Sequence, residues 1–338
     1  MHFQHFWYIV ALSDQLRPNQ LLARTVLDEW LVIFRGENGQ AVALRDRCLH
    51  RHSRLSCGAV HRGKVQCPYH GWVYDQTGNV VAVPSEGAPF TASFARQARR
   101  YVTCEQDGYI YVRLVEPQEA IAPFPMLHYG EPGWETVRLV NRFANSVTNC
   151  AENFIDVPHT ASVHPGVFRN SQRQQLAMRV ERRDGSVWVT YQNETTNLGW
   201  FRQFLNRQGQ PISHIDRFHM PNITCVEYDM GDRHLFITSQ SVPETENSTL
   251  VYTDVTFNYG RWNKLARPLV RWTAQHIINQ DMQVLKVQGE TIAKYGTQFA
   301  NTPVDTVHGF VESIRGAIAA GNDPRDLPNK TVEITFWV

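Results

Sequence analysis

The chain has 338 residues, of which 42% are hydrophobic and 19% are charged, and its formal net charge is +1. This length predicts two domains, or one domain with a large insertion, and the composition is typical of a globular protein. The balanced charge provides no basic surface for nucleic acid or for an anionic membrane. No apolar run reaches the roughly 18–20 residues of a membrane span, and the N-terminal run lacks the flanks of a secretion signal, so we expect a cytoplasmic protein.

The N-terminal third of the chain is predicted to be rich in β-strands. The predicted strands and hairpins cover residues 30–34, 40–46, 72–83 and 101–115. The segment 116–126 contains three prolines and has neither helical nor strand periodicity. We therefore predict a domain junction there, between a first domain at 1–118 and a second at 119–338.

The second domain is predicted to mix strands with helices. Strands are expected at 176–193 (a hairpin), 234–244 and 250–260, and long helices at about 261–296 and 304–320. The apolar C-terminal segment 331–338 fits either a last strand or a packed tail.

Two mixed cysteine–histidine pairs lie at loop positions of the first domain. Cys48-x-His50 and Cys67-x-x-His70 are separated by sixteen residues. A structural zinc site uses similar ligands, but its usual spacing groups two cysteines and then two histidines, so these mixed pairs fit it poorly. Chance is a weak explanation for a Cys-Pro-Tyr-His-Gly-Trp context. A Rieske [2Fe–2S] cluster needs mixed pairs, because each loop gives a thiolate to one iron and an imidazole to the other.

The Cys/His motif, with Gly71-Trp72 after it, resembles that of Rieske domains. High-potential respiratory members of that group carry a disulfide between the two loops, where this chain has Ser53 and Tyr69. The resemblance therefore implies the lower-potential oxygenase type of centre. It leaves Cys57, inside the loop, as a thiol that binds no iron.

A second pattern, N-x-x-D-x-x-H-x₄-H, places Asn153, Asp156, His159 and His164 in the second domain. Ferrous iron that activates oxygen is commonly held by two histidines and one carboxylate, with open positions for oxygen. A spacing of five does not stack two histidines on a regular helix, and the flanking prolines predict a broken one. Taken alone, two such histidines are more often partly buried structural side chains.

Together the two patterns resemble the α subunits of Rieske non-haem iron oxygenases over essentially the whole chain. The resemblance implies an α+β protein, with an all-β Rieske domain followed by a helix-grip-like antiparallel sheet with flanking helices. It implies Asp281, in HIINQDMQVLKVQGE (276–290), as the third iron ligand, with Asp254 and Glu290 as alternatives. Asp156 resembles the acidic residue that connects a cluster histidine to an iron histidine of the next subunit, and Asn153 resembles a residue near the iron.

The resemblance also implies the reaction and the partners. The chain would use O2 and mononuclear Fe(II) to hydroxylate a C–H bond of a small aromatic or alkaloid-like substrate, with loss of formaldehyde where the carbon is an O- or N-methyl. Because the chain has no G-x-G-x-x-G after a strand, we expect NAD(P)H to act through a separate reductase or ferredoxin. The bridging role of Asp156 implies a homotrimer.

The length is similar to that of the short monooxygenase branch, which includes vanillate and dicamba O-demethylases and saxitoxin-type hydroxylases. The alternatives are a ring cis-dihydroxylating dioxygenase, a non-catalytic Rieske electron carrier with a ligand-binding domain, and a zinc-stabilised binding module. Four residues are possible substrate contacts: His214, Arg217, His219 and Asn222. Trp272 is expected to pack in the core.

Overall fold

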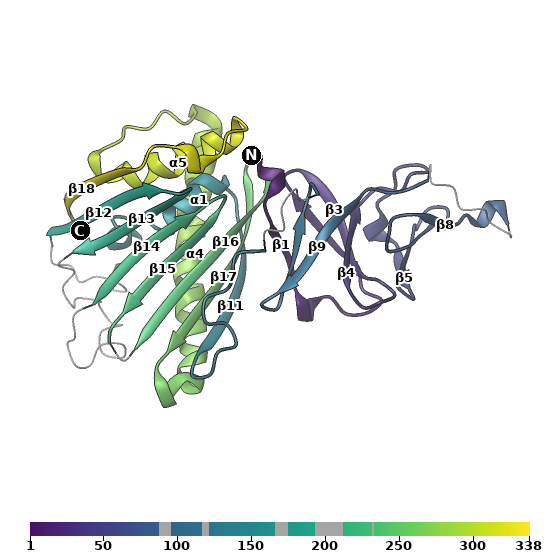
Figure 1. Ribbon diagram of the computed structural model, residues 1–338, viewed down its shortest axis with the longest axis horizontal. Helices are drawn as coiled ribbons and strands as arrows, with labels where there is room; N and C mark the ends of the chain where they lie inside the picture. Colours follow the sequence, from purple (N-terminus) through teal and green to yellow (C-terminus); the bar gives the residue numbers. More distant parts are fainter. Residues whose placement is uncertain (88–95, 117–121, 166–174, 193–211, 232) are drawn as a thin grey trace. The chain divides into compact units, whose positions relative to one another are not determined.

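The computed structural model describes residues 1–87, 96–116, 122–165, 175–192, 212–231 and 233–338 (Figure 1). These residues form two compact units. The first contains Gln4–Pro125 with Pro243–Thr245, and the second contains Met1–Phe3, Met126–Val242 and Glu246–Val338. No described helix is both long enough and apolar enough to cross a lipid bilayer.

The first unit consists of two antiparallel sheets. The larger has the strand order β1 (Tyr8–Leu12), β10 (Tyr109–Arg113), β9 (Arg100–Gln106), β4 (Ala41–Arg45), β3 (Glu29–Arg35) and β2 (Leu22–Val26). The smaller has the order β5 (Ala59–His61), β6 (Lys64–Gln66), β7 (Val73–Tyr74) and β8 (Val80–Ala82). One buried cluster includes side chains of both sheets, among them Phe34, Leu44, Val65 and Tyr74, so the small sheet is fixed to the large one by apolar burial.

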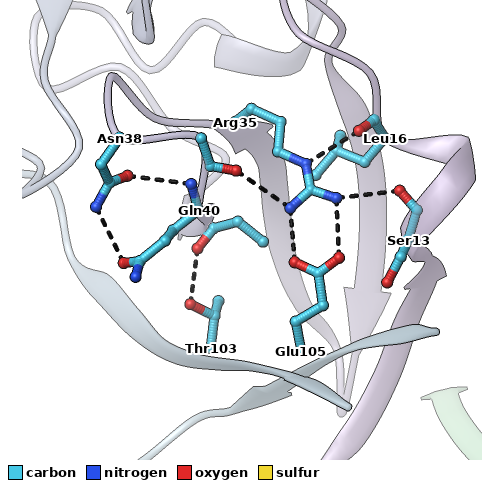
Figure 2. A network of polar contacts seen from close by, with 9 residues as sticks. Ser13, Leu16, Arg35, Asn38, Gln40, Thr103 and Glu105 are labelled. Carbon is cyan, nitrogen blue, oxygen red and sulfur yellow. Dashed lines mark hydrogen bonds and ion pairs between the residues drawn. The ribbon is translucent and has the colours of Figure 1, made fainter. Parts of the chain in front are cut away.

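Arg35 on β3 ties together distant parts of the large sheet (Figure 2). Its guanidinium makes a bidentate pair with Glu105 on β9, at 2.6 and 3.0 Å, across the intervening strand β4. The remaining N–H groups donate to the carbonyl oxygens of Leu16, Gly39 and Ser13. All five donors of the side chain are thus used, and the arginine lowers the pKa of Glu105 below its usual value.

The second unit is built on an eight-stranded antiparallel sheet. Its order is β11 (Glu135–Phe143), β17 (Ser248–Asn258), β16 (His234–Thr245), β15 (Ile223–Asp229), β14 (Ser213–His219), β13 (Ser186–Gln192), β12 (Gln175–Arg183) and β18 (Lys330–Trp337). The predicted hairpin at 176–193 is β12 and β13. The C-terminal segment is a strand rather than a packed tail, because it pairs with β12 along eight residues.

Among the described residues, four α-helices flank this sheet: α1 (Val147–Asn153), α2 (Thr160–Val163), α4 (Asn263–Tyr295) and α5 (Thr306–Ala319). The long helix α4 runs along one face of the sheet (Figure 1) and packs on β11 and β17. Val270 and Ala274 of α4 contact the buried cluster around Val255 and Phe257. The helix α5 packs on β12 and β13.

The predicted fold class is confirmed, since a β-sheet unit precedes an antiparallel sheet with flanking helices. No strand was predicted from the sequence at the positions of β1, β2, β5, β6, β11 or β15. Strand β1 pairs with β10, about a hundred residues away, so its partner is not visible in the local pattern.

Candidate active site

Two loops of the first unit bring the four predicted cluster ligands together. Cys48 and His50 follow β4, and Cys67 and His70 lie between β6 and β7. Both cysteines are buried in the core, whereas His70 is exposed. The imidazole centroids of His50 and His70 are 4.4 Å apart. The two thiols are therefore at the base of the site and the imidazoles at its surface.

The two loops have the same backbone hydrogen-bond pattern. The N–H of Cys48 donates to the carbonyl of Ser53, and the N–H of His52 donates back to the carbonyl of Cys48. In the second loop the N–H of Cys67 donates to Trp72, and that of Gly71 donates to Cys67. The fifth residue of each loop has a positive φ, 55° at His52 and 73° at Gly71, which glycine adopts with little strain. Each cysteine thus begins a closed five-residue turn.

Side chains around these loops suit thiolate and neutral imidazole ligands. The buried hydroxyl of Tyr74 lies 3.2 Å from Cys48 Sγ and accepts the N–H of Leu49 at 2.9 Å. Burial and the adjacent thiol raise the pKa of Tyr74, so the hydroxyl keeps the proton that it donates. Burial and the neighbouring His70 lower the pKa of His50, which favours the neutral imidazole that binds metal. The Nδ1 atom of His50 is buried without a hydrogen-bond partner in the described chain, as expected of a metal ligand.

The second unit brings His159, His164 and Asp281 together. One nitrogen of each histidine and a carboxylate oxygen all lie within 4.8 Å of one another. Asp281 Oδ1 is 3.0 Å from His164 Nε2 and 3.5 Å from His159 Nε2. Ligands about 2.1 Å from a common ion, at right angles, are roughly 3 Å apart. The donor set therefore fits one divalent first-row metal ion.

The local structure explains how two histidines five residues apart can face the same site. The helix α2 is only four residues long, and His159 and His164 are the residues immediately before and after it. The chain leaves the helical conformation at His164, with φ −120° and ψ 55°. This turns its imidazole toward His159, and the ring centroids are 5.3 Å apart. The predicted broken helix is thus observed.

Buried charges around the three ligands influence one another. Although burial lowers the pKa of His159, the carboxylates of Asp156 and Asp281 outweigh it and raise the value to about 9. Burial raises the pKa of Asp281, but the opposite effect of His159 and His164 is larger in sum. The pKa is therefore below its usual value, and the carboxylate stays ionised. A metal ion must displace the proton of His159, so its affinity for this site decreases as the pH falls.

Two side chains lie beside the outer nitrogens of the histidines, and only Asp156 was named from the sequence. Asp156 Oδ2 is 3.5 Å from His159 Nδ1, a separation too long for a strong hydrogen bond. Gln280 Oε1 is 2.8 Å from His164 Nδ1. When the amide oxygen accepts this N–H, the Nε2 lone pair of His164 is left for a metal. The Gln280-Asp281 dipeptide on α4 thus contacts both nitrogens of His164.

The alternative third ligands lie elsewhere. Asp254 is on β17 and pairs with Arg138 at 3.3 Å, and Glu290 is exposed on α4. Asn153 ends α1 and lines the pocket described next, with its Oδ1 buried and unpartnered among the described residues. The geometry therefore favours Asp281 as the carboxylate that completes the set.

A pocket of about 160 Å³ opens beside His159, His164 and Asp281. Its wall is mostly apolar and includes Phe154, Val226, Leu235, Ile237, Val255 and Ile278. This volume is close to the roughly 150 Å³ of a cavity that accepts a benzene ring.

Among the possible substrate contacts named from the sequence, only His214 is part of this wall. Side chains alternate along β14, so Arg217 and His219 face the other way, where Arg217 pairs with Glu227 and His219 contacts Ser186. Asn222 instead accepts a hydrogen bond from Arg315. Trp272 was expected in the core but is 63% exposed, and it stacks on His276.

Comparison with known families assigns both units. Residues 6–101 match the Rieske [2Fe-2S] domain, and residues 145–309 match the vanillate O-demethylase oxygenase C-terminal domain. The chain belongs to the Rieske non-haem iron oxygenases. Within this family it falls in the branch of vanillate and dicamba O-demethylases. The predicted family is thus confirmed, and the His-His-Asp set is consistent with its mononuclear iron.

Several characterised oxygenases are similar to this chain. The oxygenase component of dicamba O-demethylase from Stenotrophomonas maltophilia is 26% identical over 295 residues, which cover 83% of this chain and 86% of that protein. Methylxanthine N1-demethylase from Pseudomonas putida is 32% identical over 208 residues, covering 56% of each protein. This chain therefore spans about half the length of that relative. The iron-sulfur subunit of toluene-4-sulfonate monooxygenase from Comamonas testosteroni is matched over 52% of its length, at 26% identity and over 54% of this chain.

Solved structures share the whole fold. The crystal structure of dicamba monooxygenase bound to 3,6-dichlorosalicylic acid has a TM-score of 0.81 and 23% identity, and the match covers 95% of this chain and 98% of that one. The methylxanthine demethylase structure with theobromine has a TM-score of 0.72 at 21% identity, covering 94% and 91%. At these identities the likeness establishes the fold alone.

Proposed function

We propose that this protein is the terminal oxygenase component of a demethylating monooxygenase. It uses O2 and electrons from a separate reductase or ferredoxin to hydroxylate an O- or N-methyl group, which then leaves as formaldehyde. The observation that carries this proposal is the set formed by His159, His164 and Asp281, which borders an apolar pocket in a chain that also contains a Rieske domain. An electron carrier would need the Rieske domain but not this second set of ligands.

Each group of residues has a proposed task. Cys48, His50, Cys67 and His70 would hold the [2Fe–2S] cluster, which would supply one-electron transfer. The histidine–aspartate set would hold Fe(II), which would supply the site of oxygen activation. The apolar wall binds the substrate and excludes bulk water, so that the methyl group stays beside the three ligands.

The proposed electron path crosses between subunits of a homotrimer. Within one chain His70 is exposed, and the side chain of Asp156 is 39% exposed. Both are therefore accessible to a neighbouring copy, and a carboxylate that accepts N–H groups from two imidazoles fixes their separation. Asp156 would connect His70 of one subunit to His159 of the next.

The demethylation outcome is drawn from the relatives. The dicamba enzyme is named for removal of an O-methyl group, and the methylxanthine enzyme for removal of an N-methyl group. Ring cis-dihydroxylation is the second candidate outcome, and the products distinguish the two. Demethylation releases formaldehyde, whereas dihydroxylation adds both oxygen atoms to the ring.

Iron analysis and turnover test the proposal together. The purified protein should contain about three irons per chain, and Asp281→Asn should reduce this to about two while keeping the visible spectrum of the cluster. Glu290→Gln, an exposed carboxylate on the same helix, is the matched control and should retain all three. With a surrogate reductase, only the wild type and the control should release formaldehyde from methoxyarenes. Full turnover by Asp281→Asn would refute the assignment of this site.

A further inference from the structure

A buried histidine–aspartate pair faces the pocket from the sheet, separate from the predicted iron ligands. His214 Nε2 lies 2.9 Å from Asp216 Oδ1 on β14. Both residues line the pocket, and each is only 1% exposed. Burying a carboxylate and an imidazole in a mostly apolar wall is costly, so these two groups require a partner or a function.

The register of the sheet places Asp216 within the apolar wall. Asp216 is paired with Val226 on β15, and Val226 is paired with Ile237 on β16. Both of these apolar side chains line the pocket. Because residues opposite one another in a sheet project from the same face, the carboxylate projects beside them. The aspartate therefore places a carboxylate in a part of the wall that is mostly apolar.

Two aromatic rings hold His214 in a position from which its imidazole contacts only one oxygen of the Asp216 carboxylate. His214 stacks between Tyr191 and Tyr228, with centroid separations of 4.4 and 4.2 Å and interplanar angles of 21° and 22°. The imidazole held in this way reaches Oδ1. Within the described part of the chain, Asp216 has no other hydrogen-bond partner. Its second oxygen can accept a hydrogen bond from a molecule in the pocket.

The charges around the pocket favour one type of ligand. Three aspartates, Asp156, Asp216 and Asp281, are among the described lining residues, and no lysine or arginine is. Two of these aspartates are next to the predicted iron ligand His159. An anionic group near Asp216 would meet a like charge, with no lysine or arginine among the described lining residues to compensate it, whereas an N–H or O–H group would meet an acceptor.

We propose that Asp216, held by His214, selects substrates with one aromatic ring that carry a hydrogen-bond donor, such as an alcohol or an amine, and excludes carboxylates and sulfonates. This proposal rests on the proposed function, which places the reacting methyl group beside the three ligands, and it adds the class of substrate. The volume of about 160 Å³ is similar to that of a cavity that accepts one aromatic ring. The selected group differs from the acid group of dicamba and of toluene-4-sulfonate, which give two of the relatives their names.

Four ligands of nearly equal shape test the proposal by binding rather than by turnover. They are 3-methoxybenzyl alcohol, 3-methoxybenzylamine, 3-methoxytoluene and 3-methoxybenzoate. Affinities for the iron-loaded protein would be measured by calorimetry without oxygen or reductase. The alcohol and the amine should bind about tenfold tighter than the toluene, because a hydrogen bond to a charged acceptor is worth about one order of magnitude or more, and the benzoate should bind weakest.

Asp216→Asn removes the negative charge and adds a hydrogen-bond donor, while the shape of the side chain stays nearly constant. The variant should bind the amine about tenfold more weakly and the benzoate more tightly than the wild type does, because an amide can donate to a carboxylate. Asp229→Asn, on the neighbouring strand and outside the pocket lining, should leave all four affinities unchanged. A role of Asp216 in stability alone would not produce this crossover.

Two results would overturn the proposal. One is a wild-type protein that binds the benzoate as well as the amine or better, a result that does not depend on whether the variant folds. The other is a folded Asp216→Asn variant whose ranking of the four ligands is unchanged. Failure of the proposed function would appear differently, as normal ligand selectivity without formaldehyde release once a reductase is supplied.

Discussion

Removal of the hydroxyl group of Tyr74 should lower the reduction potential of the cluster. This hydroxyl is 3.2 Å from Cys48 Sγ, and the side chain is fully buried. Tyr74→Phe keeps the ring and removes the hydroxyl that donates to Cys48. Because reduction adds negative charge to the cluster and its thiolates, this hydrogen bond stabilises the reduced form more than the oxidised one.

The size of the shift follows from the strength of such a bond. A hydrogen bond to a charged group contributes roughly 1.5–3 kcal/mol, and a difference of about 1 kcal/mol between the two oxidation states is a reasonable share of it. Since 1.36 kcal/mol and 59 mV both correspond to a tenfold change in a one-electron equilibrium, the potential should fall by about 40 mV. The N–H of Leu49, which donates to the same hydroxyl, loses its acceptor, so the free energy of unfolding should also fall by about 1–3 kcal/mol.

The potential can be measured by a reductive titration followed by circular dichroism of the cluster. Tyr101→Phe is the control, because Tyr101 is also buried in the first unit but donates to Glu29, at 2.6 Å, rather than to a cysteine. It should leave the potential within a few millivolts of the wild-type value. An unchanged potential in a fully loaded Tyr74→Phe protein, or an equal fall in the control, would refute the reasoning.

Two further predictions concern packing and pH. A Cβ added at Gly289 on α4 would lie 2.5 Å from the carbonyl oxygen of Ala144, so Gly289→Ala should lower the free energy of unfolding by about 1–3 kcal/mol. A Cβ added at Gly309 on α5 meets no described atom within 4 Å, so Gly309→Ala should raise the free energy of unfolding by up to about 1 kcal/mol. Thermal unfolding of the two variants measures both changes. The Glu152 carboxylate, 2.5 Å from His308 Nδ1, raises the pKa of that histidine above its unfolded value. The wild type should therefore be more stable than Glu152→Gln below about pH 6.5, and it should lose this advantage as the pH rises through the pKa of His308 in the folded protein. Urea unfolding at several pH values measures the difference in stability. A difference that stayed constant with pH would contradict the prediction.

The residues that could be predicted from the sequence belong to short, chemically distinctive patterns. The mixed pairs at Cys48 and Cys67 are local, because each pair lies within a single five-residue turn. The pattern around His159 and His164 is also local. Asp281 was reachable only through the family resemblance, since more than a hundred residues separate it from the histidines that it approaches in the fold.

Contacts set by sheet register could not be predicted. Strand alternation left both faces of β14 open, so Arg217 and His219 seemed as suitable for the pocket as His214. The pairing of β14 with β15 and the position of α4 decide which face is inside, and both depend on long-range packing. Asp216, Gln280 and the hydrogen bond from Tyr74 were missed for the same reason.

The matched turns at Cys48 and Cys67 have a consequence for the speed of electron movement. Each turn is closed by its own backbone hydrogen bonds, which do not involve the cysteine thiols. We therefore expect the two turns to change little when a bound cluster gains or loses an electron. The reorganisation energy should then be small, and the rate of electron transfer should depend mainly on the distance to the acceptor.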